Sequence, residues 1–209
     1  MTVAKYNKAK VLSEGRMLTP WFRAAFVNVF QVAKALEEGK EGRYEVTMLF
    51  DPKSVDLTAM KELVYNCAKA KFGSKIPPSK TFDLPPEFRS PFRDGDTKPD
   101  YTGYEGMVFA PARSKHKPQV IDADRIEIGQ MDQPGFYSGC YARASIGVWA
   151  YDTKGNKGVS FNLNSVQKLA DGEAFGGGRV DAEDEFDDAN DFAAITPDTN
   201  GEGDQESWM

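Results

Sequence analysis

The sequence has little cysteine and almost no histidine, with two cysteines and one histidine among 209 residues. Disulfide scaffolds and zinc sites need several closely spaced residues of these types. Cys67 and Cys140 form no CxxC pair, so we expect two reduced, buried thiols. His116 lies in the basic segment Arg113-Ser-Lys-His-Lys117, where a surface histidine is a better interpretation than a catalytic one. A disulfide scaffold and a zinc site are therefore excluded.

The sequence also lacks the short motifs of several enzyme classes. It contains no P-loop, no GxSxG nucleophile elbow and no HExxH pair. The glycine triplet at 176–178 lacks the strand-to-helix context of a phosphate-binding loop, which favours a hinge. Two acid pairs, Asp94 with Asp96 and Asp122 with Asp124, leave a metal-dependent nuclease open, although aspartate is also expected in turns. We expect no cofactor, no bound metal and no catalytic residue.

No stretch approaches the ~20 consecutive apolar residues that cross a bilayer. The N-terminal segment MTVAKYNKAKV has no apolar core of the kind that a secretion signal needs. We therefore expect a cytoplasmic protein with no membrane partner. Because 40% of the residues are hydrophobic and 12% aromatic, the chain can still build one folded domain.

Charge is distributed unevenly along the chain. Residues 179–209 carry 11 acidic residues and one basic residue, whereas residues 1–178 carry 25 basic and 21 acidic residues. The two parts therefore have net charges of −10 and +4. Low hydrophobicity with high charge predicts a glycine hinge and a disordered acidic tail at 176–209. The folded domain at 1–175 is mildly basic, which suits a polyanionic partner.

Most of the chain before this tail carries strand patterns. The clearest is Arg43–Phe50, where apolar side chains alternate with mostly polar ones, as in a strand with one buried face. Apolar residues at helical spacing then predict one amphipathic helix, with Ser54 or Asp56 as its N-cap and Gly73 at its end. Several antiparallel strands with one helix indicate a small α+β barrel or sandwich. Further strands are expected at 10–12, 18–30, 107–110, 120–121, 135–152 and 157–163, with a hairpin between the last two.

The segment 75–104 is rich in proline, phenylalanine, arginine and aspartate, and shows neither helical nor strand periodicity. Loops longer than ~12–15 residues inside compact domains are usually functional or disordered. Five aromatic residues between Phe82 and Tyr104 argue against disorder. We expect an embellishing loop that folds over a surface or a ligand.

The strand pattern at 140–151 is the strongest functional signal. Side chains of one parity are small and apolar, whereas the other parity carries Tyr141, Arg143, Trp149 and Tyr151. Exposed aromatic rings are unfavourable unless something stacks on them. Bases of single-stranded nucleic acid stack on such rings with about 1–3 kcal/mol each, while arginine contacts phosphate or a base plane. Two alternatives remain open, in which the embellishing loop or a second copy of the chain covers this face.

The same pairing of an aromatic residue with arginine recurs at Trp21 and Arg23. Trp21 is about equally compatible with the core and with a stacking platform. Lys154 and Lys157 flank the turn of the last hairpin and are further candidates for phosphate contacts. The acidic tail can occupy a nucleic-acid groove as a polyanion mimic, or bind other proteins.

With these features in place, the sequence resembles the single-stranded DNA-binding proteins of tailed bacteriophages. The resemblance lies in Phe136-Tyr-Ser-Gly-Cys-Tyr-Ala-Arg-Ala-Ser145, in Gly155-Asn-Lys-Gly-Val-Ser-Phe-Asn-Leu-Asn-Ser-Val-Gln-Lys168 and in the acidic tail around 184–188. It implies a mainly β, OB-like antiparallel barrel with one amphipathic helix, a long embellishing loop and a disordered acidic tail. The candidate DNA-binding residues are Tyr137, Tyr141, Arg143, Trp149, Tyr151, Trp21, Arg23, Lys154 and Lys157.

The resemblance also implies a function and partners. It points to sequence-tolerant, non-enzymatic binding of single-stranded DNA in phage replication, recombination or repair, in the host cell cytoplasm. The tail would contact replication or recombination proteins. A nuclease, or a structural phage protein with an aromatic subunit interface, is the alternative, and the chain can also form a homo-oligomer. The candidate partner-binding residues are the acids and aromatics Asp184, Glu185, Phe186, Asp187, Asp188 and Phe192.

Overall fold

The computed structural model describes residues 6–13, 15–34, 41–153 and 155–175. The chain divides into two units, residues 1–176 and 177–209, and the fold below is that of the first unit. Several residues and segments singled out in the sequence lie outside the described residues: the hinge and tail at 176–209, the tail residues Asp184, Glu185, Phe186, Asp187, Asp188 and Phe192, and the hairpin lysine Lys154.

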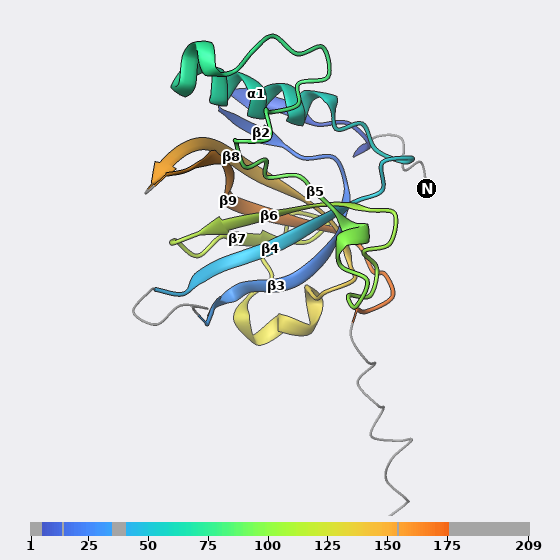
Figure 1. The fold of residues 1–209 in the computed structure, drawn as a ribbon. Helices are drawn as coiled ribbons and strands as arrows, with labels where there is room; N and C mark the ends of the chain where they lie inside the picture. The colour runs from blue at the N-terminus through green and yellow to red at the C-terminus, as the bar shows by residue number, and fades with distance from the viewer. Residues whose placement is uncertain (1–5, 14, 35–40, 154, 176–209) are drawn as a thin grey trace, which may run out of the picture. The chain divides into compact units, whose positions relative to one another are not determined.

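The described residues are mostly β-strand, with a single α-helix, as the sequence patterns predict (Figure 1). The predicted strand at Arg43–Phe50 is β4, with the same bounds. In chain order the elements are β1 (Lys10–Ser13), β2 (Arg16–Leu18), β3 (Phe22–Ala33), β4 (Arg43–Phe50), α1 (Thr58–Phe72), η2 (Gly73–Lys75), β5 (Arg93–Asp94), η3 (Gly95–Thr97), β6 (Val108–Ser114), β7 (Gln119–Ile121), η4 (Gln130–Gly135), β8 (Tyr141–Thr153) and β9 (Asn156–Ala170).

Five of these strands close into a ring. β8 pairs with β3, β3 with β4, β4 with β6, β6 with β9, and β9 with β8 again. A five-stranded, partly open barrel of this kind is the OB fold. The barrel is not antiparallel throughout, because β6 and β9 run parallel, with Ala112 opposite Phe161. The long chain between these two strands allows this, since parallel neighbours need a crossover connection.

Helix α1 lies across one end of the barrel, against β8 and β9 (Figure 1). Its buried residues Met60, Val64 and Ala68 belong to the same apolar core as the barrel strands. At its start the backbone N–H of Thr58 donates to the carboxylate of Asp56 at 2.9 Å, which holds the pKa of Asp56 below its usual range. The helix ends before Gly73, whose φ of +59° is readily adopted by glycine.

The embellishing loop covers the outside of the barrel. Its strand β5 pairs with β6, and its residue Tyr104 is buried in a second small cluster with Leu49 and Phe109. The prediction that this loop folds over a surface is therefore confirmed. The loop leaves Trp149 on the aromatic face of β8 49% exposed, although its residue Arg89 lies close to Tyr151.

Strand β8 follows the predicted parity over its first half. Ala142, Ala144 and Ile146 are buried, as expected. A register shift between Ser145 and Ile146 then disturbs the alternation, and Ser145, which was expected on the outer face, is only 7% exposed. A β-bulge of this kind places two residues against one and turns the following side chains.

The alternation of buried and exposed side chains along β3 breaks at Phe26. Phe26 has the same parity as Phe22 and Ala24, which are buried, but it is 46% exposed. Its backbone has a φ of +48°, and the pairing with β4 shifts register between Ala25 and Asn28. This irregularity turns the Phe26 ring outward, where it lies 5.2 Å from the ring of Tyr101.

Candidate nucleic-acid interface

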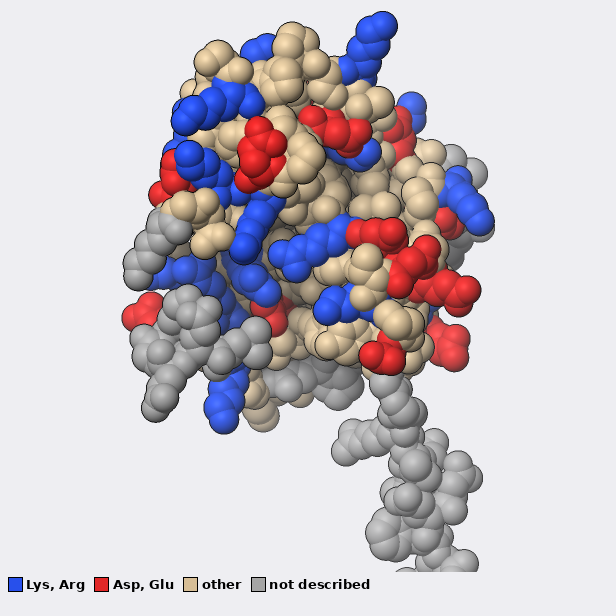
Figure 2. All heavy atoms as spheres, viewed as in Figure 1, with Lys and Arg blue, Asp and Glu red and all other residues tan. Residues whose placement is uncertain are grey.

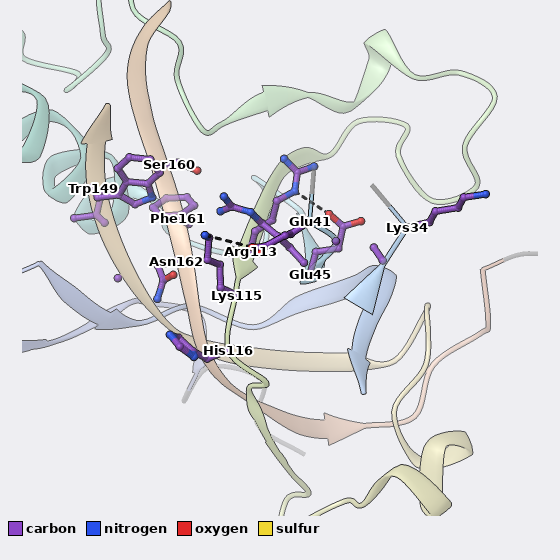
Figure 3. A pocket seen from close by; sticks show the side chains of 15 residues that line it. Lys34, Glu41, Glu45, Arg113, Lys115, His116, Trp149, Ser160, Phe161 and Asn162 are labelled. Carbon is purple, nitrogen blue, oxygen red and sulfur yellow. Dashed lines mark hydrogen bonds and ion pairs between the residues drawn. The ribbon is translucent and has the colours of Figure 1, made fainter. Parts of the chain in front are cut away.

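An open groove of about 820 Å³ crosses the barrel between β4, β6, β9 and β8. Trp149 on β8 forms one wall, Phe161 on β9 lies between the walls, and Arg113 on β6 approaches from the other side (Figure 3). In OB barrels the second and third strands, with the loops after the first and fourth, form the ligand-binding face. Around this ring those strands are β4 and β6, and both line the groove, together with Lys34, Glu41 and Gly42 at the described ends of the β3–β4 connection. The groove therefore lies on the face where OB barrels bind their ligands.

The groove has an excess of positive charge. Its two acids are paired: Arg113 Nε donates to Glu45 at 2.8 Å, and Lys115 Nζ lies 3.5 Å from Glu41. Both cationic side chains remain open to solvent, Arg113 with 51% and Lys115 with 63% of the side chain exposed. Exposed ion pairs contribute only ~0–1 kcal/mol, so these pairs can yield to a phosphate. The basic residues lining the groove are Lys34, Arg43, Arg113 and Lys115, with His116 beside them.

Figure 2 shows how charge divides over this face of the barrel. Lysine and arginine side chains gather on the left of the view, over the side where β6 ends and the β8–β9 hairpin turns. Acidic side chains gather mainly on the right, over β5 and η3. The groove is therefore on the basic side of the domain.

Trp149 and Tyr151 form a pair of aromatic side chains at the edge of the groove. Their ring centroids are 5.6 Å apart, at an angle of 50°. Trp149 is exposed on the predicted outer face of β8, and Tyr151 is partly exposed. Lys157, across the hairpin, is paired with Asp152 at 3.6 Å. Of the predicted residues that the structure describes, Trp149 alone lines the groove, with Tyr151 and Lys157 close to it along the hairpin.

Arg23 belongs to a different cluster, at the other end of β8. Its guanidinium lies over the rings of Tyr141 and Phe175, 4.8 and 4.6 Å from their centroids. It also donates to the backbone oxygens of Gly139 at 2.5 Å and Glu173 at 2.6 Å. Arg23 thus ties the segment after β9 to β3.

Tyr137 makes similar intramolecular contacts. Its hydroxyl lies 3.0 Å from the Asp171 carboxylate and 2.9 Å from the Gly172 backbone oxygen, and burial raises the pKa of this phenol. The neighbouring ammonium of Lys168 lowers the pKa of Asp171. Tyr137 and Arg23 therefore hold the same segment, Asp171–Phe175, against the barrel.

Trp21 and Arg143 are also packed against the domain. Trp21 is half-buried against the core, 5.7 Å from the ring of Tyr141, and its indole N–H is buried without an acceptor among the described residues. Arg143 donates to Gln167 at 2.8 Å and lies over the ring of Tyr6 at 4.6 Å. Neither side chain lines the groove.

Most of the basic residues of the groove are not among the residues predicted from the sequence. Arg113 and Lys115 lie in the basic segment 113–117, which indicates only a surface histidine, and nothing in the sequence marks Lys34 or Arg43. No local pattern marks them, because they face Trp149 only once β4, β6 and β8 have joined the same ring.

The structure gives no support to the metal-dependent alternative. Among the described residues, no three histidine, cysteine, aspartate or glutamate side chains are placed to share a metal ion. Asp94 and Asp122 accept hydrogen bonds from the backbone N–H groups of Asp96 and Asp124, as in turns.

Burial raises the pKa of both Cys67 and Cys140. In the described part of the chain, no helix is long and apolar enough to span a bilayer.

Residues 16–195 match a protein-family model described as the single-stranded DNA-binding protein of Enterobacter phage Enc34. A curated relative, putative protein p50 of Acyrthosiphon pisum secondary endosymbiont phage 1, is 45% identical over 97 residues, which are 46% of this chain and 50% of the relative. The matched chain thus spans about half the length of that relative.

Solved structures share the fold. The bacteriophage Enc34 single-stranded DNA-binding protein in complex with ssDNA has a TM-score of 0.67 and 24% identity, over 81% of this chain and 94% of the other. A further structure of the single-stranded DNA-binding protein from bacteriophage Enc34 has a TM-score of 0.61 and 25% identity, over 87% of this chain and 95% of the other. The gp2.5 protein of bacteriophage T7, also single-stranded DNA-binding, has a TM-score of 0.56 and 15% identity, over 85% and 99%.

Proposed function

Since this chain belongs to the family of the Enterobacter phage Enc34 single-stranded DNA-binding protein, we propose that it binds single-stranded DNA in its groove, without sequence preference and without catalysing a reaction. The observation that carries this proposal is the position of the exposed Trp149 ring opposite the cationic side chains Arg113 and Lys115. Aromatic platforms beside a basic groove are what single strands require.

The two kinds of side chain have different tasks. Bases stack on Trp149 and Tyr151, and every base offers a face for this contact. Arg43, Arg113 and Lys115 neutralise phosphates, which carry no sequence information. Duplex DNA keeps its bases stacked inside and cannot use the rings. Binding is therefore selective for single strands and tolerant of sequence.

We assign the remaining predicted residues to two groups. Lys157 extends the phosphate contacts along the hairpin, beside Tyr151. Arg23, Tyr137 and Tyr141 act as positioning residues for the segment after β9. Trp21 packs on Tyr141, and Arg143 supports the same end of β8 through Gln167. A direct contact of Arg143 with DNA would first require that its bond to Gln167 breaks.

The biological setting is the replication, recombination or repair of phage DNA in the host cytoplasm. The acidic tail is the proposed contact for replication or recombination proteins, since it carries a net charge of −10 with aromatic residues among the acids. The same tail is the proposed competitor of DNA for the basic groove. Family membership and charge support these roles.

Titration of labelled oligo-dT and of duplex DNA of the same length, each with and without Mg²⁺, tests the proposed function. We expect tight binding of oligo-dT, much weaker binding of duplex, no dependence on Mg²⁺ beyond screening, and an intact oligonucleotide afterwards. Equal affinity for both DNAs would contradict the stacking mechanism. Cleavage that requires Mg²⁺ would instead establish the nuclease alternative.

A further inference from the structure

A second basic surface begins where the groove ends. Between Leu63 and Phe82 the chain contains four lysines and no acidic residue. Three of these lysines lie at the end of α1 and in η2, and all three are exposed. Two of them, together with the exposed Arg89, form a surface that we name the helix-end patch: Lys71, Lys75 and Arg89.

One contact joins the helix-end patch directly to the aromatic pair. The Nζ of Lys71 donates to the backbone oxygen of Ala150 at 2.9 Å. Ala150 lies between Trp149 and Tyr151 on β8. The ammonium group is therefore held beside the strand that presents both rings.

Two further contacts bring Arg89 to the same place. Phe88 packs on Phe72 of α1, with ring centroids 4.8 Å apart. Arg89 then pairs with β9 through its backbone. Its backbone N–H donates to the backbone oxygen of Lys157 at 2.8 Å, and its backbone oxygen accepts from the backbone N–H of Val159 at 3.0 Å. The loop residue Arg89 is thus fixed next to the β8–β9 hairpin.

Gly158 shows how close Arg89 and Tyr151 are. A Cβ at position 158 would lie 2.8 Å from the Cβ of Arg89 and 2.9 Å from the hydroxyl of Tyr151. The Tyr151 ring therefore passes over Gly158 toward Arg89. Of the nearby acids, Asp152 is paired with Lys157, and Glu87 is exposed two residues before Arg89.

From this geometry we propose that the helix-end patch is a second DNA-contacting surface, which takes the phosphates of a single strand after it has left the groove past Trp149 and Tyr151. The inference rests on the proposed function and extends the path of the same ligand. Lysines in the last turn of a helix also interact favourably with the helix dipole, which is an alternative reason for their presence. That effect accounts for Lys71 but not for Lys75 or Arg89, which lie outside α1.

The test compares a short strand that fills only the groove with a long one that reaches the patch. Oligo-dT of about 5 and about 16 nucleotides spans the range of site sizes known for OB folds. The variant Lys75→Gln/Arg89→Gln removes two charges and leaves both the bond of Lys71 to β8 and the backbone bonds of Arg89 to β9 intact. The matched control, Lys53→Gln/Lys98→Gln, removes two exposed lysines elsewhere.

We expect the patch variant to bind the short oligonucleotide like the unmodified protein and the long one several-fold more weakly. The salt dependence for the long strand should become shallower by roughly 1.4, since each phosphate contact on a single strand contributes about 0.7. The control should change neither. Losses that are equal for the two lengths, or no greater than those of the control, would overturn the patch. Failure of the unmodified protein to bind either strand would instead refute the proposed function itself.

Discussion

At the scale of single residues, the exposed ring of Trp149 can be removed without opening the core. Its side chain is 49% exposed. Trp149→Ala should weaken oligo-dT binding by about 1–3 kcal/mol, the usual contribution of one base stacked on an aromatic ring. The melting temperature should stay nearly unchanged, and Trp149→Phe should keep most of the affinity. A loss of folding stability of about 3–5 kcal/mol, typical of aromatic truncation in a core, would show that the ring is structural.

Substitutions of two arginines test whether DNA lies in the groove or at the other end of β8. Arg113 lines the groove and has half of its side chain exposed, whereas Arg143 is bonded to Gln167. Arg113→Gln should make the salt dependence of oligo-dT binding shallower by about 0.7, the contribution of one phosphate contact. Arg143→Gln should change it less, and Arg125→Gln, at an exposed position that does not line the groove, should not change it. A larger effect of Arg143→Gln than of Arg113→Gln would show that DNA binds at the other end of β8.

Tyr104 makes folding stability sensitive to alkaline pH. Burial raises its pKa from 10.0 to about 12. The folded state therefore holds this proton more tightly than the unfolded state, and its contribution is full below pH 10 and is lost as the pH rises toward 12. Chemical denaturation at several pH values should show a fall in stability in this window, and Tyr104→Phe should reduce that fall. An identical pH profile for the variant would contradict this assignment.

At the scale of whole elements, the sequence patterns predict those strands, helices and turns that depend on interactions between residues close together in the chain. The alternation in β4, the amphipathic face of α1 and the turn before Asn156 depend on residues a few positions apart. The groove does not: Arg113 and Trp149 meet only through the closed ring of strands. The exposure of Phe26 could not be predicted for a related reason, since a bulge depends on the partner strand rather than on the periodicity of the strand itself.

The buried parity of β8 predicts how an overpacked element behaves. Ala144 is 1% exposed, in the middle of the barrel core. Ala144→Tyr should destabilise the domain by at least about 1–3 kcal/mol and can prevent folding, because a full core has no room for the larger ring. Thr153→Tyr, at the exposed end of the same strand, should leave stability within about 0.5 kcal/mol of the unmodified protein. Circular dichroism during thermal melting measures the stability of both variants. Equal stabilities would contradict the assignment of Ala144 to the buried face of β8.

At the scale of the whole molecule, the opposite charges of its two parts predict competition for the groove. Deleting residues 179–209 removes a net charge of −10 and leaves a body of +4. A tethered acidic segment has an effective concentration in the millimolar range near a groove that it can reach. Truncation should therefore raise oligo-dT affinity, most strongly at low salt, where the Debye length is about 30 Å at 0.01 M.

Binding titrations of the full-length and truncated proteins at two salt concentrations measure this effect. A tail that carries protein contacts should also make capture of purified replication proteins dependent on residues 179–209. Equal DNA affinity at low salt would rule out competition and leave the tail as a protein-binding or solubilising segment.

The parallel pairing of β6 with β9 also determines when the groove comes into existence. Ala112 and Phe161, which meet in this pairing, are separated by the whole of β7, η4 and β8. Non-local strand pairs form late and slowly, because the loop must close before any contact is gained. During synthesis, at roughly 5–20 residues per second, the basic residues of β4 and β6 emerge seconds before the strand that completes their site. A nascent chain without β9 has no complete groove, so affinity for single strands arises only after β9 has been synthesised and has closed the barrel.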